Sequence, residues 1–240
     1  MAAPPTLAAA IAALRRLHGE PQGPPATDPF ELVLFENVAY LASPERRREA
    51  FEELRRTAGT TPAAILAARA GDLERSASRG ILKGTSAAKL RECARIAVEE
   101  LGGDVDAALD LAGEGAAKVL RRFPGIGQPG ADKILLFGGR RASLAPESNG
   151  LRVLARLGIV REESSYARTY AAAIAAAAEA LPPGTAAMTR AHLLLQRHGQ
   201  TLCRRTAPLC DACPLARGCV HARSGRAAGE KHPPPGRTRR

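Results

Sequence analysis

Hydrophobic residues recur at helical spacing along most of the chain. Apolar positions repeat every three to four residues through Thr6–Leu17, and the same pattern returns after each short break until about residue 202. Valine, isoleucine and threonine never gather into the alternating runs that are typical of strands. The pattern therefore predicts an all-α protein.

Local signals indicate where the helices begin and end. A Pro/Gly-rich link over 19–29 precedes an apolar helix at Phe30–Ala42. Ser43-Pro44 and Thr61-Pro62 each place an N-cap residue before a proline, which favours a helix start. Further helices are expected from Thr85 or Ser86 to Leu101, over 104–122 with a break at Gly113–Gly115, and over 129–138, Ser148–Leu157, Ser164–Leu181 and Ala186–Leu202.

Positive charge is concentrated near the end of the chain. The formal net charge is +11, and residues 183–240 hold 11 Lys/Arg against only Asp211 and Glu230. This imbalance indicates a polyanionic partner such as nucleic acid, although a basic tail can also serve solubility alone. No leader or bilayer-length apolar run is evident, so we expect a cytoplasmic protein with no membrane partner, where clustered cysteines are more often metal ligands than disulfides.

Four cysteines fall close together after the last predicted helix. Cys203, Cys210, Cys213 and Cys219 form the pattern C-x6-C-x2-C-x5-C. Thiolates at this spacing can hold a [4Fe–4S] cluster or one tetrahedral Zn²⁺. Structural zinc usually draws on two short C-x2–4-C knuckles, and only one is present, so the cluster is favoured. The remaining Cys93, alone inside a predicted helix, is expected to be a core residue.

A second motif joins two predicted helices. Residues 120–127 read L-R-R-F-P-G-I-G, with Ile126 expected to pack between the helices. Glycines permit a tight turn, and its backbone amides, with those that start the next helix, can bind a phosphate oxygen without reading the base. The residues expected to contact DNA are Arg121, Arg122, Gly125, Ile126, Gly127, Gln128 and Lys133.

The cysteine spacing and this hairpin together resemble the endonuclease III and adenine-mismatch glycosylase superfamily, over roughly residues 29–219. The resemblance implies a monomeric base-excision DNA glycosylase that binds double-stranded DNA at the nucleoid and carries a [4Fe–4S] cluster. It also implies a two-domain helix-hairpin-helix fold with the DNA and the active site between the domains. The expected parts are a six-helix domain over 31–141, a cluster domain made of 1–30 plus 142–222, and a basic disordered tail over 223–240.

Cleavage of an N-glycosidic bond requires a carboxylate near the sugar, because the transition state resembles an oxocarbenium ion. The segment 146–153 resembles the superfamily's catalytic Asp motif, with Glu147 in place of the Asp. Ser148 and Asn149 follow it and are expected to assist in the base pocket. Glu147 could also be only the acidic residue of a helix start. Pro129 occupies the position where bifunctional members carry a nucleophilic Lys, which predicts a monofunctional enzyme.

Glu36 is the second candidate catalytic acid. It lies in an otherwise apolar helix, at the spacing from Pro29 where adenine-mismatch glycosylases carry a catalytic Glu, and burial would suit it to protonating a base. A Glu paired with a buried Arg is the alternative. Asn37 and Tyr40, on the same helix, are expected to line the base pocket. Two other functions stay open: a non-catalytic iron–sulfur DNA-binding protein on the same scaffold, and an AP lyase that uses Lys133.

Overall fold

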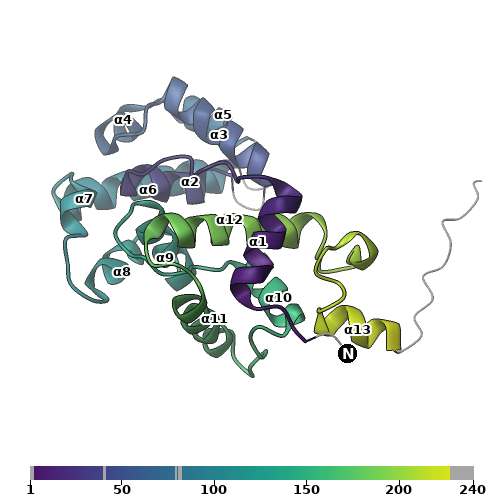
Figure 1. The fold of residues 1–240 in the computed structure, drawn as a ribbon. Coiled ribbons are helices and arrows are strands. Elements are labelled where there is room, and N and C mark those ends of the chain that lie inside the picture. The colour runs from purple at the N-terminus through teal and green to yellow at the C-terminus, as the bar shows by residue number, and fades with distance from the viewer. Residues whose placement is uncertain (1–2, 40–41, 79, 81–82, 228–240) are drawn as a thin grey trace, which may run out of the picture. The chain divides into compact units, whose positions relative to one another are not determined.

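The structure, a computed structural model, describes residues 3–39, 42–78, 80 and 83–227, and these residues form helices and no strand (Figure 1). The predicted all-α class is confirmed. The chain divides into two compact units. The first comprises Met1–Pro21, Pro146–Pro182 and Arg190–Arg240, and the second comprises Gln22–Ala145 and Pro183–Thr189.

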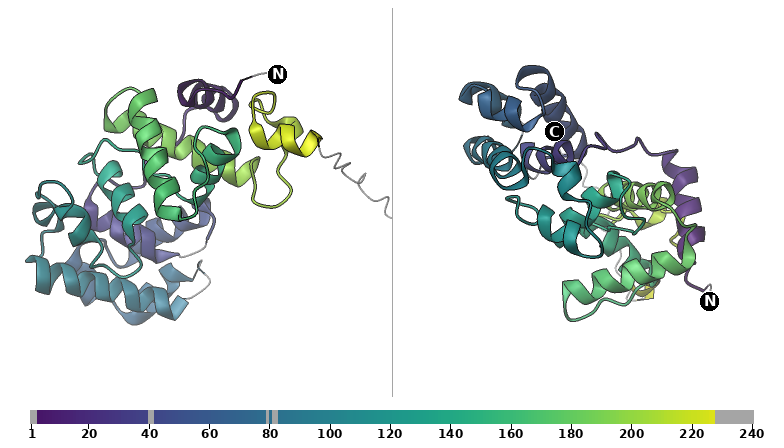
Figure 2. Two further views of the ribbon diagram at one scale, coloured as in Figure 1. Left: turned by 90° about the horizontal axis from the view of Figure 1, so that it is seen from below. Right: turned by 90° about the vertical axis from the view of Figure 1, so that its left-hand side faces the viewer.

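The second unit is built around the long helix α6. Its helices are α2 (Pro29–Val38), α3 (Pro44–Thr57), α4 (Pro62–Ala67), α5 (Ala70–Ala77), α6 (Lys83–Leu101), α7 (Val105–Ala108), α8 (Gly115–Leu120) and α9 (Gln128–Phe137). Helix α6 packs against α2, α4 and α5, and α2 also packs against α3 and α9 (Figure 2). Val33, Phe51 and Leu90 are fully buried among these helices, and burial of each such side chain contributes about 1.5–3 kcal/mol.

Predicted caps begin several of these helices. The side chains of Ser43 and Thr61 accept hydrogen bonds from the amides of Arg46 and Ala64, as the sequence predicts. Each such cap is worth about 1 kcal/mol. The predicted end of α2 at Ala42 is wrong, because Ala39 leaves the helical conformation with φ −145° and ψ 74°.

The first unit contains α1 (Leu7–His18), α10 (Ser148–Leu157), α11 (Tyr166–Ala180), most of α12 (Thr185–Thr201), the short 3-10 helix η1 (Cys210–Ala212) and α13 (Val220–Ala227). Helix α10 packs against α11 and α13, and α1 packs against α11. A Cβ at Gly199 of α12 would lie 2.7 Å from the carbonyl oxygen of Asn149. Only glycine therefore fits where α12 meets the start of α10.

The end of the described chain differs from the sequence prediction. Residues 223–227 are helical, in α13, where a disordered tail was expected from residue 223. Ala222 is buried, and the hydroxyl of Ser224 donates to the carbonyls of Val220 and His221, so packing and local hydrogen bonds support this helix. The rest of the predicted tail, 228–240, lies outside the described residues.

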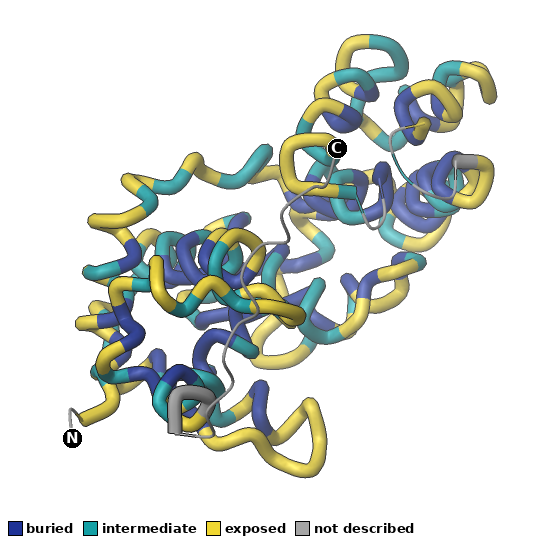
Figure 3. The backbone as a smooth tube through the Cα atoms, turned by 90° about the vertical axis from the view of Figure 1, so that its right-hand side faces the viewer, coloured by how far each residue is buried: buried dark blue, intermediate teal, exposed yellow. Residues whose placement is uncertain are grey.

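Buried positions follow the inward sides of the helices in each unit, with exposed positions on the opposite sides (Figure 3). This is the distribution that the helical hydrophobic pattern predicts. Among the described residues, no helix is long and apolar enough to cross a membrane.

Candidate functional site

The hairpin between α8 and α9 has the tight turn that its glycines predict. Gly125 adopts φ +77°, a conformation that favours glycine. A Cβ added there would lie 2.8 Å from Oδ1 of Asn37 on α2. Asn37 is 3% exposed, and its amide donates to the carbonyl of Val33 and contacts the sulfur of Cys93. Asn37 thus lies beneath the hairpin turn.

The start of α9 leaves backbone donors available. Gly127 is the N-cap residue and gives no side-chain cap, and a proline follows within the first turn. The carbonyl of Phe123 accepts from the amide of Ile126, whose side chain is 6% exposed and packs near Gly130. Uncapped amides at a helix start form a site with partial positive charge. Gln128 donates across the first turn to Asp132 at 3.0 Å.

The arginines around the hairpin differ in how they are held. Arg122 pairs with Glu100, and Arg140 pairs with Asp106 at 2.7 Å. Arg141 donates to the buried Asp132 at 2.9 Å. Arg121 is exposed, and within the described part of the chain no ion pair of its side chain is found. Of these cations Arg121 is therefore the one best placed to meet a phosphate.

Glu36 and Lys133 come together within the second unit. Lys133 on α9 donates to Oε2 of Glu36 on α2 at 2.8 Å, and their side chains are 13% and 16% exposed. Nη1 of Arg47 lies 3.8 Å from the same oxygen. The carboxylate is thus paired with two cations in a largely buried position. Tyr40, the other residue expected in this region, lies outside the described residues.

Glu147 occupies the N-cap position of α10. Its Oε1 accepts from the amide of Gly150 at 3.0 Å, and its Oε2 accepts from the side-chain amide of Asn149 at 2.8 Å. The hydroxyl of Ser148 lies 3.4 Å from Oε2. The carboxylate is only partly buried. It is therefore fixed in one orientation at the positive end of a helix, with lone pairs left over for other groups.

Arg152, one turn along α10, links this carboxylate to the cysteine loop. Its guanidinium donates to Oδ1 of Asn149 at 2.7 Å, to the carbonyl of Gly199 at 2.8 Å and to the carbonyl of Cys203 at 3.0 Å. Burial lowers the pKa of Arg152, while the nearby Cys203 opposes this shift. Arg152 has no role predicted from the sequence, although it lies in the same motif as Glu147.

The four clustered cysteines line one pocket of the first unit. The pocket residues are Val153, Arg156, Leu157, His198, Leu202, Cys203, Pro208, Leu209, Cys210, Cys213, Ala216, Cys219, His221 and Ala222. Burial raises the pKa of the Cys210 thiol, and the neighbouring Cys219 and Cys203 add to this increase. Within the described residues no three His, Cys, Asp or Glu side chains are grouped as ligands of one metal ion. The thiols thus share a cavity, and their chemistry suits an iron–sulfur cluster or zinc.

Two further side chains contact these sulfurs. Nη1 of Arg156 lies 3.6 Å from Sγ of Cys203, and the same nitrogen donates to the carbonyl of Arg204. Nε2 of His198 lies 3.5 Å from Sγ of Cys213. Burial and, to a smaller extent, the charge of His18 lower the pKa of His198 to about 4, so this imidazole is neutral near pH 7. Neither Arg156 nor His198 was singled out from the sequence, although His198 lies five residues before Cys203.

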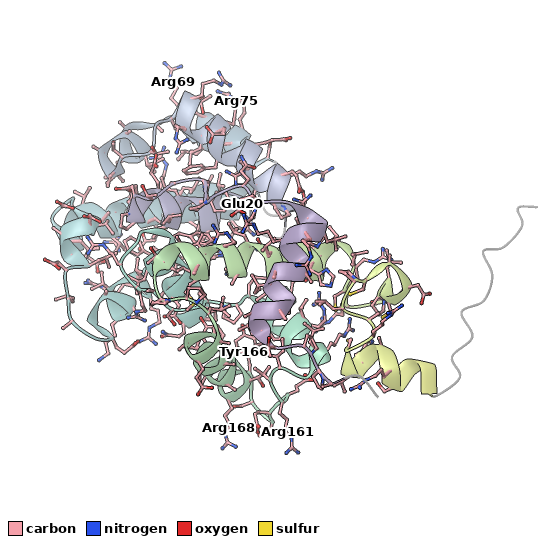
Figure 4. The ribbon with its side chains drawn as sticks, in the orientation of Figure 1. Glu20, Arg69, Arg75, Arg161, Tyr166 and Arg168 are labelled. Carbon is pink, nitrogen blue, oxygen red and sulfur yellow. The ribbon has the colours of Figure 1, made fainter. Side chains whose placement is uncertain are left out.

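Tyr166 lies close to the Glu147 carboxylate and was also missed. Burial and then the charge of Glu147 raise the pKa of its hydroxyl. Its ring stacks on Tyr170 with centroids 5.9 Å apart, yet Tyr166 remains 50% exposed. Arg161 and Arg168 point outward nearby, at the N-terminal end of α11 (Figure 4). Tyr166 is exposed and so does not belong to the repeating pattern of buried apolar residues. The sequence therefore gives no signal that this ring lies close to a carboxylate.

Comparisons with known proteins agree with this geometry. Endonuclease III of Thermotoga maritima is 26% identical over 199 residues, which cover 83% of this chain and 86% of that protein. An inferred DNA repair glycosylase of Methanocaldococcus jannaschii is 30% identical over 96 residues, but this match spans only 40% of this chain and 41% of that protein. No protein-family profile matches the chain.

Solved structures share the fold. A trapped endonuclease III–DNA covalent intermediate has a TM-score of 0.70 and 17% identity, and it covers 90% of this chain and 95% of its own. A thermostable thymine-DNA glycosylase also has a TM-score of 0.70, at 15% identity, and covers 89% of this chain and 95% of its own. The chain is thus similar in sequence to an endonuclease III and to a DNA repair glycosylase, and it shares its fold with endonuclease III and with a thymine-DNA glycosylase.

Proposed function

We propose that this divergent relative of endonuclease III is a monofunctional DNA glycosylase, which hydrolyses the N-glycosidic bond of a damaged or mismatched base flipped out of double-stranded DNA. The observation that carries the proposal is the fixed carboxylate of Glu147. The Gly150 amide and the Asn149 side chain hold it at 3.0 Å and 2.8 Å. A carboxylate that needs no reorganisation is the group best suited to an oxocarbenium-like transition state.

Glu147 acts on the sugar. As the bond between sugar and base lengthens, positive charge develops on the sugar, and a carboxylate beside it lowers the barrier. The same group can orient a water molecule and accept its proton. Glutamate is one methylene longer than the superfamily's aspartate. The side-chain amide nitrogen of Asn149 donates to Oε2 of Glu147, while Oδ1 of Asn149 accepts from Arg152. Because Arg152 fixes the Asn149 side chain, Asn149 in turn holds the longer Glu147 side chain in one orientation.

Glu36 assists the leaving base. The pair with Lys133 holds a proton between a carboxylate and an ammonium group at 2.8 Å, in a position largely protected from water. A proton donor in such a position makes the displaced base a better leaving group. In the proposed reaction Lys133 remains an ammonium group, and Glu36 takes up a proton from water and delivers it to a ring nitrogen of the base. Asn37 supports the hairpin from below, whereas Ser148 and Asn149 support Glu147.

The hydrolytic reaction is favoured over a lyase reaction. Pro129 has no side-chain nucleophile, and the amine of Lys133 donates to Glu36. An ammonium group has no free electron pair with which to attack a sugar. Borohydride reduction of the protein on abasic DNA should therefore trap no covalent complex. A trapped complex that disappears in Lys133→Met would instead establish the AP lyase.

The cysteine pocket is the proposed site of an iron–sulfur cluster. Cys203, Cys210, Cys213 and Cys219 would hold a [4Fe–4S] cluster, which would crosslink a loop that contains no long helix. Arg156 and Arg152 then fasten that loop to α10. Protein purified without oxygen should contain iron and acid-labile sulfide in equal amounts. Zinc without sulfide would contradict the cluster and favour a tetrahedral zinc site.

Phosphate binding is assigned to the hairpin. The uncapped amides after Gly127 donate to a phosphate oxygen, and the exposed Arg121 adds a charged contact. Such contacts position the duplex without reading its sequence. The protein would act as a monomer on the DNA of the nucleoid, within the cytoplasm.

The test is release of free base from duplexes that contain uracil, thymine opposite guanine, adenine opposite oxidised guanine, oxidised pyrimidines or alkylated bases. The proposal expects release from at least one duplex, with strand breaks only after hot alkali. Tight duplex binding with no base released from any of them would favour the non-catalytic DNA-binding protein. The observation that supports this second candidate is that Glu147 caps α10, a role that requires no catalysis.

A further inference from the structure

His198 of α12 lies between a candidate cluster ligand and the N-terminal helix. Its Nε2 is 3.5 Å from Sγ of Cys213, and its Nδ1 is 3.3 Å from Nε2 of His18 on α1. The two imidazole rings meet edge to face, with centroids 5.5 Å apart and an interplanar angle of 62°. His198 is 1% exposed and lines the same pocket as the four cysteines. Both of its ring nitrogens thus have a partner.

Counting hydrogens fixes the direction of these two bonds once Cys213 is a ligand. A metal-bound cysteine is a thiolate, which can only accept a hydrogen bond. Nε2 of His198 must therefore carry the hydrogen, and in a neutral imidazole Nδ1 is then the acceptor. His18 supplies the matching donor from its own Nε2. The chain of bonds runs from His18 through His198 to Cys213.

We propose that His198 is a positioning residue for the cluster, which donates its Nε2–H to the sulfur of Cys213 while His18 selects the required tautomer. This inference rests on the cluster in the proposed function. A hydrogen bond to a ligand sulfur stabilises the more negative, reduced form of a cluster and raises its reduction potential. A purely structural role would need only the volume of the ring, which a leucine supplies without two polar atoms to satisfy.

The surroundings of the other sulfurs support a specific role for His198. Cys203 faces the guanidinium of Arg156, whereas Sγ of Cys219 lies 3.2 Å from the carbonyl oxygen of Arg156, an acceptor that offers it no hydrogen. His198 is the neutral donor in contact with the sulfur of Cys213. Through its second contact, with Nε2 of His18, His198 also connects α1 to the cysteine loop.

The experiment compares full-length protein with its variants His198→Leu, His198→Gln and His18→Phe. Iron and sulfide content is measured first, and the midpoint potential of the cluster's one-electron couple is then measured by voltammetry. His198→Leu should make reduction about tenfold less favourable, a shift of about 59 mV to more negative potential. His198→Gln keeps an N–H donor and should stay closer to the parent protein. His18→Phe should shift the potential in the same direction as His198→Leu, by less.

Leu202→Val is the matched control, because it changes an apolar side chain in the lining of the same pocket and removes no side-chain hydrogen bond. Its potential should remain near that of the parent protein. Equal potentials in His198→Leu and the parent protein would overturn the inference while leaving the cluster intact. If His198→Leu is purified without iron, retention of the cluster by His198→Gln supports the donor role, and loss from both variants overturns it. Absence of iron and sulfide from the parent protein would instead refute the cluster itself.

Discussion

The ammonium nitrogen of Lys133 lies 2.8 Å from Oε2 of Glu36, and this bond joins α9 to α2 across 97 residues of sequence. Both side chains are largely buried, so the pair lies where water screens it poorly. It connects the helix that follows the hairpin with the helix that carries Asn37 beneath the turn. The pair therefore contributes to the packing of α2 against α9, in addition to the role in the reaction that we propose for Glu36.

Breaking this pair should destabilise the protein. Lys133→Met removes the nearer cation from the Glu36 carboxylate, while Nη1 of Arg47 remains at 3.8 Å, and we expect a loss of about 1–3 kcal/mol in the free energy of unfolding. The double variant Lys133→Met with Glu36→Gln should lose less than the sum of the single losses, because the bond between these two groups can be lost only once. Urea unfolding of the four proteins measures this coupling. Strictly additive losses would show that the two groups do not interact.

The hairpin turn should be sensitive to a single methyl group. Gly125→Ala would place a Cβ at φ +77° and 2.8 Å from Oδ1 of Asn37. Gly139→Ala is the matched control, since Gly139 has φ +76° and no heavy atom within 4 Å of the added carbon. Both variants should lose about 1 kcal/mol from the left-handed backbone conformation, but only Gly125→Ala should lose more. Its duplex affinity should fall as well, measured by fluorescence anisotropy at fixed salt.

Equal stability and equal DNA affinity in these two variants would contradict the proposed close contact between the turn and Asn37. If Gly125→Ala loses stability but keeps its affinity for the duplex, the close contact between the turn and Asn37 is supported. The same result would show that the hairpin does not bind the DNA. The comparison at several salt concentrations adds a second readout, because a lost phosphate contact lowers the salt dependence of binding.

Local signals explain why most helices could be predicted. The helix over Ser148–Leu157 was predicted with both its ends, because Glu147 caps its start and Gly158, at φ +80°, ends it. The break near Gly113–Gly115 is present, but α7 ends already at Ala108, which propensity alone does not indicate. Residues 223–227 were expected to be disordered, since their composition does not reveal that α13 packs against α10.

The site was predictable only in part. The cysteines and the hairpin lie in short motifs, so their spacing in the sequence already groups them. The bonds from Lys133 to Glu36 and from Arg152 to the Cys203 carbonyl span 97 and 51 residues, and they depend on tertiary packing. A single sequence carries no signal for such pairs. For the same reason His198 could not be distinguished from an ordinary buried histidine.

The burial of the Cys93 thiol should make the stability of the protein depend on pH. Burial raises the pKa of this thiol from 9.0 to about 12. Above pH 9 the unfolded thiol loses its proton while the folded one keeps it, so stability falls as the pH rises from 9 toward 12. At pH 10 this contribution is about 1.4 kcal/mol relative to pH 8. Urea unfolding of the parent protein and of Cys93→Ala at both pH values isolates the contribution of the Cys93 thiol. All other groups titrate in both proteins, so their contributions cancel in the comparison.

The parent protein should lose about 1.4 kcal/mol more stability between pH 8 and pH 10 than Cys93→Ala does. Alkylation at pH 8 gives an independent readout: Cys93 should react with iodoacetamide only after unfolding. An equal loss of stability in both proteins, together with rapid alkylation of the folded chain, would mean that the thiol is accessible to water.

The most direct test of the account is single-turnover base release by the parent protein and by Glu147→Gln, on a duplex that the parent protein cleaves. The amide keeps the volume of the side chain and can still accept from the Gly150 amide, so the fold and the duplex affinity should change little. The rate of base release by Glu147→Gln should be at least about 100-fold lower, because the negative charge beside the sugar is lost. Base release by Glu147→Gln at the rate of the parent protein would contradict the proposed catalytic role of Glu147.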